Sequence, residues 1–196
     1  MNLAFDIFTG IGVAAAVGIR PFLPALAVGA LAAGDIQIDF SHTSYAFLEG
    51  GVFLFVMVIG VVLLALTERY TAREVLETRS VLLTIGAASV VIGALLFAGS
   101  LARAHHAIWP GLIGGEICAL VGIAATRPLL ARVRARLDAA SASALPLFAE
   151  AGALLSAVLS VLLPPVGLIV LALLLWLLIA GRGRTEQKYA GLRILR

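Results

Sequence analysis

The amino-acid sequence predicts an all-α, polytopic membrane protein of about six transmembrane helices, built as a 3+3 inverted repeat with a proline-broken first helix. Of its 196 residues, 62% are hydrophobic and 13% are charged, whereas a soluble domain averages about 45–50% apolar and about 25% charged residues. The apolar residues fall into runs close to the roughly 20 residues that a spanning helix needs. Two of these runs also resemble each other in sequence.

The predicted transmembrane domain covers residues 1–181. Its expected spans are 3–33, 46–66, 80–102, 107–126, 146–163 and 166–181. The first is too long for one straight span, and Arg20, Pro21 and Pro24 interrupt it near 18–24. Proline removes a backbone donor and opens a helix. Two interpretations of this first segment stay open, one kinked span or a re-entrant hairpin.

The positive charges are distributed unevenly along the chain. Twelve of the fourteen Lys and Arg residues lie in the segments 67–80 and 127–145 or after residue 181. Six spans place these three regions on one side of the membrane, with Arg103 on the other side and Arg20 within the bilayer. The positive-inside rule then predicts a cytoplasmic (inner) membrane protein with both termini cytoplasmic. Residues 182–196 are expected to form a basic cytoplasmic tail.

Segment 127–145 has an apolar stripe at helical spacing. It therefore predicts a helix that lies along the cytoplasmic interface and binds anionic lipid headgroups. A solvated linker is the alternative. The residues expected at the lipid interface are Arg127, Arg132, Arg134 and Arg136.

The two similar runs indicate an internal repeat. GIGVAAAVGI at 10–19 aligns with GGEICALVGI at 114–123, which divides the domain into halves at about 1–102 and 103–181. Three spans in each half would invert the second half relative to the first, an arrangement found in secondary transporters. Inversion would bring Glu116 to the depth of Arg20, so we expect these two residues to pair.

Arg20 is the main candidate for a functional residue, because intramembrane charges usually face a bundle interior or a wet cavity and have a partner. With Gly18 and Pro21 it forms a predicted substrate-binding site for an anionic group, and a structural ion pair is the alternative. Glu116 is expected to act as its counter-ion or to carry a proton. Glu49 and Glu150 are predicted gating or coupling residues, unless they are hydrated carboxylates at the membrane boundary.

Several classes of site are not expected. His42, His105 and His106 fall on the predicted outer side, where Asp35 and Asp39 offer an alternative metal or pH-sensing interpretation, but their spacing matches no metal motif. The sequence has no Gly-rich phosphate loop, HExxH or serine nucleophile motif. We therefore expect no metal, no cofactor and no enzymatic activity. Nucleic acid is not an expected partner either, because the basic residues already have a topological explanation.

Three segments carry a resemblance to a known family. They are GIRPFLP at 18–24, PGLIGGEICA at 110–119 and EQKYAGLRILR at 186–196. With them, nearly the whole chain resembles a bacterial integral-membrane family filed among the domains of unknown function. The resemblance implies a small multispanning protein and supplies no substrate, cofactor or site.

Two classes of function follow from these observations. The first is a small transporter or channel-like protein for an anionic or lipid-like solute, with Arg20 as the residue that faces the anion. The alternative is a non-transporting membrane scaffold that recruits a cytoplasmic partner or anionic lipid through its basic segments. A lipid-modifying enzyme has the least support. The small size of the chain is compatible with a homodimer.

Overall fold

The computed structural model describes residues 3–70 and 78–190, with the side chains of residues 139–140 and 182–190 left aside. Within these ranges the chain is helical and the structure has no strand. The helices are α1 (Leu3–Ile19), α2 (Phe22–Ala33), the short 3-10 helix η1 (Ala46–Leu48), α3 (Gly51–Tyr70), α5 (Arg79–Arg103), α6 (Trp109–Arg134), α7 (Ala139–Leu162) and α8 (Pro165–Ala190).

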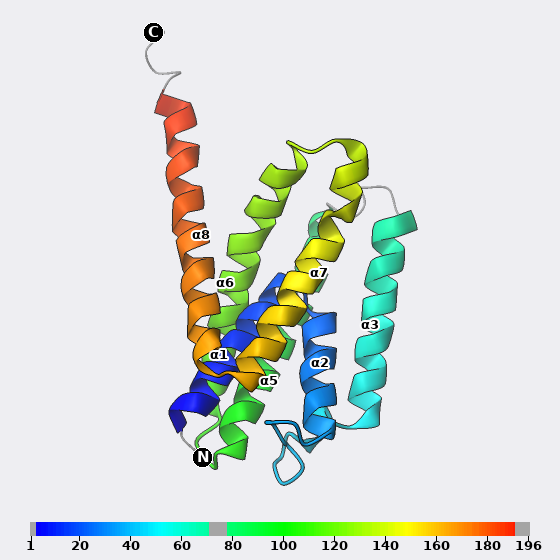
Figure 1. Ribbon diagram of the computed structural model, residues 1–196, viewed down its shortest axis with the longest axis vertical. Helices are drawn as coiled ribbons and strands as arrows, with labels where there is room; N and C mark the ends of the chain where they lie inside the picture. Colours follow the sequence, from blue (N-terminus) through cyan, green and yellow to red (C-terminus); the bar gives the residue numbers. More distant parts are fainter. Residues whose placement is uncertain (1–2, 71–77, 191–196) are drawn as a thin grey trace.

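The first two helices form a helical hairpin. α1 rises into the bundle and α2 returns to the end where α1 began (Figure 1). Arg103 confirms this arrangement, because its guanidinium binds both Asp6 of α1 and the carbonyl of Gln37, which follows α2. Of the two interpretations left open by the sequence, the hairpin is therefore the one observed.

Two prolines explain the position of the turn. Pro21 has no N–H and disfavours helical geometry in the residue before it, so the last helical bond of α1 runs from the Arg20 N–H to the Ala16 carbonyl, at 3.2 Å. Pro24 lies in the first turn of α2, where a backbone N–H has no intrahelical partner in any case. The break separates Arg20 from both helices, and its side chain extends beyond the tip of the hairpin.

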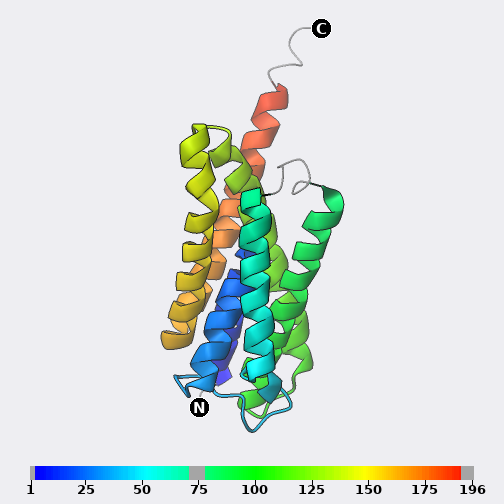
Figure 2. The ribbon, with the colours of Figure 1, turned by 90° about the vertical axis from the view of Figure 1, so that its right-hand side faces the viewer.

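The remaining helices α3, α5, α6, α7 and α8 run the length of the bundle in alternating directions (Figures 1 and 2). Four described helices are long and apolar enough to cross a membrane: Gly51–Tyr70, Arg79–Arg103, Trp109–Arg134 and Ser141–Leu162. The apolar parts of α1, α2 and α8 are shorter. The predicted count of six spans is not confirmed, because the first predicted span is the hairpin.

The hairpin also changes the expected orientation of the chain. The start of α1 and the end of α8 lie at opposite ends of the bundle (Figure 1), so the prediction that both termini share one side of the membrane is not confirmed. The basic segments do share one side, since the end of α3, the start of α5 and the end of α6 lie together. We call this the basic end. The opposite end carries the loops at 34–50 and 104–108, and we call it the histidine end.

α1 forms the centre of the bundle. Residues 13–17 are completely buried, and α1 packs against α5, α6, α7 and α8. Glycines allow this close packing: a Cβ on Gly18 would lie 2.2 Å from the Ala119 carbonyl oxygen, and one on Gly122 would lie 2.5 Å from the Ala15 oxygen. α3, in contrast, packs on α2 and η1 and leaves most of its apolar side chains exposed, as a lipid-facing helix would.

The inverted repeat is not confirmed. Gly10 and Gly114 both face the Phe97 ring, and Gly18 further along α1 faces Ala119 further along α6. α1 and α6 therefore run in the same direction, as Figure 1 shows, whereas the predicted inversion needed them to be opposed. The first half also contains a hairpin and two long helices rather than three spans.

The predicted surface helix over 127–145 is wrong. α6 continues through Pro128 to Arg134, and α7 begins at Ala139. Asp138 is the N-cap of α7 and accepts a hydrogen bond from the Ser141 N–H at 3.2 Å, which is how an N-cap stabilises a new helix. The four arginines of this segment thus lie on the last turns of α6 and in the turn that follows it.

We predict that Gly122→Ala destabilises the protein, because the added methyl group would push α6 away from the backbone of α1. Overpacking of this kind typically costs about 1–3 kcal/mol. The measurement is the free energy of unfolding in detergent micelles. Gly152→Ala on α7 is the matched control, since a Cβ there meets nothing within 4 Å, and equal losses in both variants would contradict the prediction.

Candidate functional site

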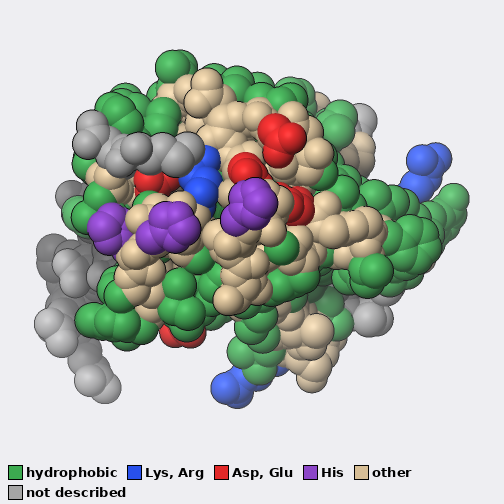
Figure 3. Space-filling view, turned by 90° about the horizontal axis from the view of Figure 1, so that it is seen from below, with side chains coloured by type: hydrophobic (Ala, Val, Ile, Leu, Met, Phe, Trp, Pro, Cys, Tyr) green, Lys and Arg blue, Asp and Glu red, His purple; other side chains and the backbone are tan. Residues whose placement is uncertain are grey.

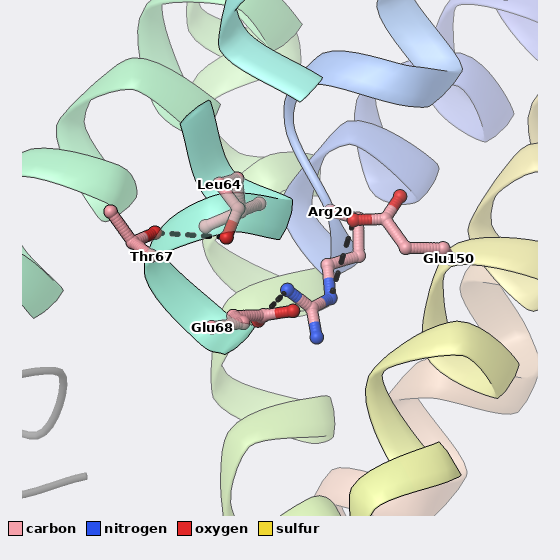
Figure 4. Close-up of polar contacts among 5 residues, drawn as sticks. All are labelled: Arg20, Leu64, Thr67, Glu68 and Glu150. Carbon is pink, nitrogen blue, oxygen red and sulfur yellow. Dashed lines mark hydrogen bonds and ion pairs between the residues drawn. The ribbon is translucent and has the colours of Figure 1, made fainter. Parts of the chain in front are cut away.

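The candidate site is an ion cluster around Arg20 at the tip of the hairpin (Figure 4). The Arg20 Nη1 donates to Glu68 Oε1 of α3 at 2.5 Å, and Arg20 Nε lies 3.8 Å from Glu150 Oε1 of α7. The three side chains are 12%, 26% and 20% exposed, respectively. One guanidinium therefore joins three elements of the bundle within largely apolar surroundings.

The two carboxylates bind Arg20 unequally. The contact with Glu68 is a short, charge-assisted hydrogen bond, whereas the contact with Glu150 is an ion pair beyond hydrogen-bond distance. Glu150 Oε2 is buried and has no hydrogen-bond partner among the described residues. If all three groups are ionised, the cluster has a net charge of −1. Of the two carboxylates, Glu150 thus has the weaker contact with Arg20, and one of its oxygens lacks a hydrogen bond among the described residues.

Glu116 is not the partner of Arg20, so the predicted pair is wrong. Glu116 is exposed and lies about two turns from the start of α6, toward the histidine end. Arg20 lies at the far end of α1. Because α1 and α6 run in the same direction, the two residues are at different depths. The pairing followed from the inversion that the structure does not have.

The other predicted site residues have separate positions. Gly18 is a packing contact with α6, and Pro21 is buried at the helix break. Glu49 lies at the histidine end, where its Oε2 accepts a hydrogen bond from the Phe40 N–H at 2.8 Å. Of the predicted gating or coupling pair, only Glu150 belongs to the cluster around Arg20.

Glu68 of α3 is not among the predicted site residues, because a carboxylate near the end of a span is usually an ordinary boundary charge. A usable signal was present. Once the first segment is read as a hairpin, Arg20 lies 14 residues before Gly34 and Glu68 lies 17 residues after Gly51. At about 1.5 Å per residue, their backbones differ in depth by roughly 5 Å, which an arginine side chain can span.

The predicted lipid-interface arginines all belong to the basic end. Arg127 Nη2 donates to the Leu82 carbonyl of α5 at 2.8 Å, and Arg132 Nε donates to the Pro128 carbonyl at 3.0 Å. Arg136 is exposed in the turn after α6. Arg134 is partly buried, and its Nε has no hydrogen-bond partner in the described part of the chain.

A second ion cluster closes the base of the hairpin at the histidine end. Arg103 binds Asp6, whose side chain is 1% exposed, and its Nη1 donates to the Gln37 carbonyl at 2.5 Å. Gln37 and the nearby Asp35 and His105 have left-handed backbones, with φ of 61°, 54° and 55°. Such geometry is unfavourable for non-glycine residues. Contacts with the rest of the bundle, such as the Arg103 hydrogen bond to Gln37, therefore stabilise these loop conformations.

Histidine and acidic side chains gather around a basic side chain on the histidine end (Figure 3). No three His, Cys, Asp or Glu residues in residues 3–70 and 78–190 lie close enough to hold a metal ion. Asp39 accepts a hydrogen bond from the Ser41 N–H at 2.7 Å. Hydrogen bonds from Ser41 hold the pKa of Asp39 below its ordinary value, so this carboxylate already has partners within its own turn.

A family model described as a domain of unknown function (DUF4126) matches residues 7–182. This range includes most of the hairpin, the ion cluster around Arg20, and every long helix up to the apolar part of α8, whereas Asp6 lies one residue before it. No curated protein matches the chain, and no solved structure matches it.

We predict that Arg20 and Glu68 are energetically coupled and that Arg20 and Glu116 are not. Arg20→Gln leaves two carboxylates without their counter-ion, and breaking a buried pair in this way costs about 3–5 kcal/mol. In a double-mutant cycle on unfolding in micelles, Arg20→Gln with Glu68→Gln should show a coupling of about 0.5–3 kcal/mol. Arg20→Gln with Glu116→Gln should be additive within about 0.5 kcal/mol. Equal couplings in the two cycles would refute this assignment.

We also predict that Arg103→Gln loosens the hairpin. The variant leaves the Asp6 carboxylate buried without a counter-charge, which again costs about 3–5 kcal/mol of unfolding free energy. Adding Asp6→Asn should restore part of the loss, because it removes the unpaired charge. The exposed Arg79→Gln on α5 is the control. A loss no larger than that of the control would show that the Arg103 contacts are dispensable.

Proposed function

The chain belongs to the DUF4126 family, a domain of unknown function, and we propose that it is a small membrane transporter for an anionic or lipid-like solute that binds at Arg20. The observation that carries this proposal is the position of Arg20. It lies at a helix break inside the bundle, and its contact with Glu68 is shorter than its contact with Glu150. Interrupted helices that present a charged or polar tip inside the membrane are a recurring feature of transporter binding sites. Catalysis is not part of the proposal.

The proposed mechanism is an exchange of ligands on the guanidinium. Glu68 stays on Nη1 and keeps the hairpin tip attached to α3. Glu150 lies 3.8 Å from Nε, so a proton taken up by Glu150 would weaken this contact. The Nε side of Arg20 would then accept an anionic group in place of the carboxylate. Release of the anion and of the proton on the opposite side of the membrane would restore the resting cluster, so anion and proton would move together.

The proposed orientation places the basic end in the cytoplasm and the histidine end outside an inner membrane. It rests on the positive-inside rule, because the described arginines outside the bundle gather at the basic end, except for Arg103. The tip of the hairpin then approaches the cytoplasmic side from within the bilayer. The other proposed class, a non-transporting scaffold, would also use the basic end but would make no use of the ion cluster.

We predict that Arg20→Gln abolishes anion flux, whereas Glu150→Gln permits flux that no longer depends on pH. The first variant removes the charge that binds the anion. The second mimics a permanently protonated Glu150. The assay measures the uptake of radiolabelled inorganic phosphate, sulfate or succinate into proteoliposomes at several pH values, and a pH-sensitive dye inside them reports the proton that moves with the anion. Loss of one charge-assisted hydrogen bond is worth roughly 1.5–3 kcal/mol, which is about ten-fold or more in flux.

Glu116→Gln is the matched control, because this exposed carboxylate lies outside the cluster. Its flux should equal that of the unmodified protein. Wild-type flux in Arg20→Gln would remove Arg20 from the mechanism. The absence of flux for all three probe anions in the unmodified protein would favour the scaffold.

A further inference from the structure

An apolar groove opens between α7 and α8. The two helices meet at the turn of Pro164 and Pro165 and diverge toward the basic end (Figure 1). They leave a cavity of about 280 Å³, with Ile19 of α1 and Leu129 of α6 among its lining residues. Its two hydroxyl groups, on Thr126 and Ser156, both donate to carbonyls of their own helices. The groove therefore presents mainly hydrocarbon to whatever occupies it.

A second cavity, of about 170 Å³, lies between α6 and α8 at the basic end. Arg132 and Arg136 line it from α6 and the turn that follows, one helical turn apart, and Trp176 lines it from α8. Neither arginine has an ion pair with a carboxylate among the described residues. Arg132 reaches across to α8, since a Cβ on Gly181 would lie 3.1 Å from its Nη2.

The two cavities adjoin each other, because Leu129 and Leu177 line both. The groove runs along α7 from Leu145 to Ser156, a distance of about 16 Å at 1.5 Å per residue. One leaflet of a hydrocarbon core of about 30 Å has nearly the same depth. The combined space thus has a cationic end at the interface and an apolar part as long as one leaflet.

We infer that this space binds one anionic phospholipid from the leaflet at the basic end. Its phosphate contacts Arg132 and Arg136, and one acyl chain lies in the groove between α7 and α8. Guanidinium groups suit phosphate because they donate two parallel hydrogen bonds, and tryptophan is favoured at the headgroup level. The inference does not depend on transport at Arg20, because none of the three charged residues of that cluster lines either cavity.

The test uses Trp176 as the reporter. The chain has two tryptophans, so Trp109→Phe leaves Trp176 as the single fluorophore in the full-length, detergent-purified protein. Phosphatidylglycerol with brominated acyl chains should quench it saturably, with an apparent affinity about ten-fold or more above that of phosphatidylcholine with the same chains. The double variant Arg132→Gln, Arg136→Gln should lose this preference.

The proposed position of the acyl chain is tested with substitutions that place a larger side chain in the groove. Gly152 lines it, and a Cβ at this position meets nothing within 4 Å, so Gly152→Leu should project into the groove and lower phosphatidylglycerol affinity about ten-fold. Gly51→Leu is the matched control, because Gly51 also has open space and lies on α3. Arg79→Gln is the control for charge at the basic end. If Gly152→Leu melts at a lower temperature than its parent, Ser156→Leu fills the same groove one turn further along.

Three results would overturn the inference. The first is equal quenching by the two lipids, which indicates only a general hydrophobic surface. The second is phosphatidylglycerol binding that survives the arginine variants or both groove variants. The third is displacement of the lipid by inorganic phosphate at equal concentration, which indicates an anion site without a lipid chain.

Discussion

The architecture depends on how one guanidinium is neutralised inside an apolar bundle. Arg20 leaves the helical path because Pro21 follows it, and its charge then needs partners that water would otherwise supply. Glu68 and Glu150 provide them from α3 and α7. The pairing matters most for the position of α3, because this helix otherwise packs on α2 and η1. The ion cluster therefore joins the outermost helix of the bundle to its interior at the basic end, as the η1 contact does at the histidine end.

The hairpin that carries this charge is held by packing along α1 and by ions at both of its ends. Small residues bring the backbone of α1 against α6 and α8: besides the Gly18 and Gly122 contacts, a Cβ on Gly167 of α8 would lie 2.0 Å from the Phe8 carbonyl oxygen. Without a hydrophobic driving force between helices in lipid, such close contact is a main source of association. Arg103 then fixes the open end of the hairpin. Packing thus sets the position of α1, and the two arginines set its depth.

Local features of the sequence predicted much of this structure. Hydropathy located α3, α5, α6, α7 and α8, because a bilayer requires long apolar helices, and Pro21 located the break after Arg20. The direction in which the chain continues after that break could not be predicted from local sequence. It depends on the contacts of Arg103 with Asp6 and Gln37, which lie 97 and 66 positions away. The choice of Glu116 rather than Glu68 as the partner followed from this one ambiguity. Glu150 was predicted as a gating or coupling residue, and the packing of α1 and α2 against α7 brings it near Arg20.

The burial of α1 also bears on the order in which the chain is made. Synthesis proceeds from the N-terminus, so α1 and α2 leave the ribosome before α5, α6, α7 and α8, the helices against which α1 packs. At that stage the hairpin has an apolar surface and carries Arg20 and Asp6, but the later helices that pack against it are not yet present. The contacts that bury α1 are therefore complete only after these later helices have been synthesised. Assembly of this small protein is therefore completed by its latest helices, which supply the contacts of its earliest segment.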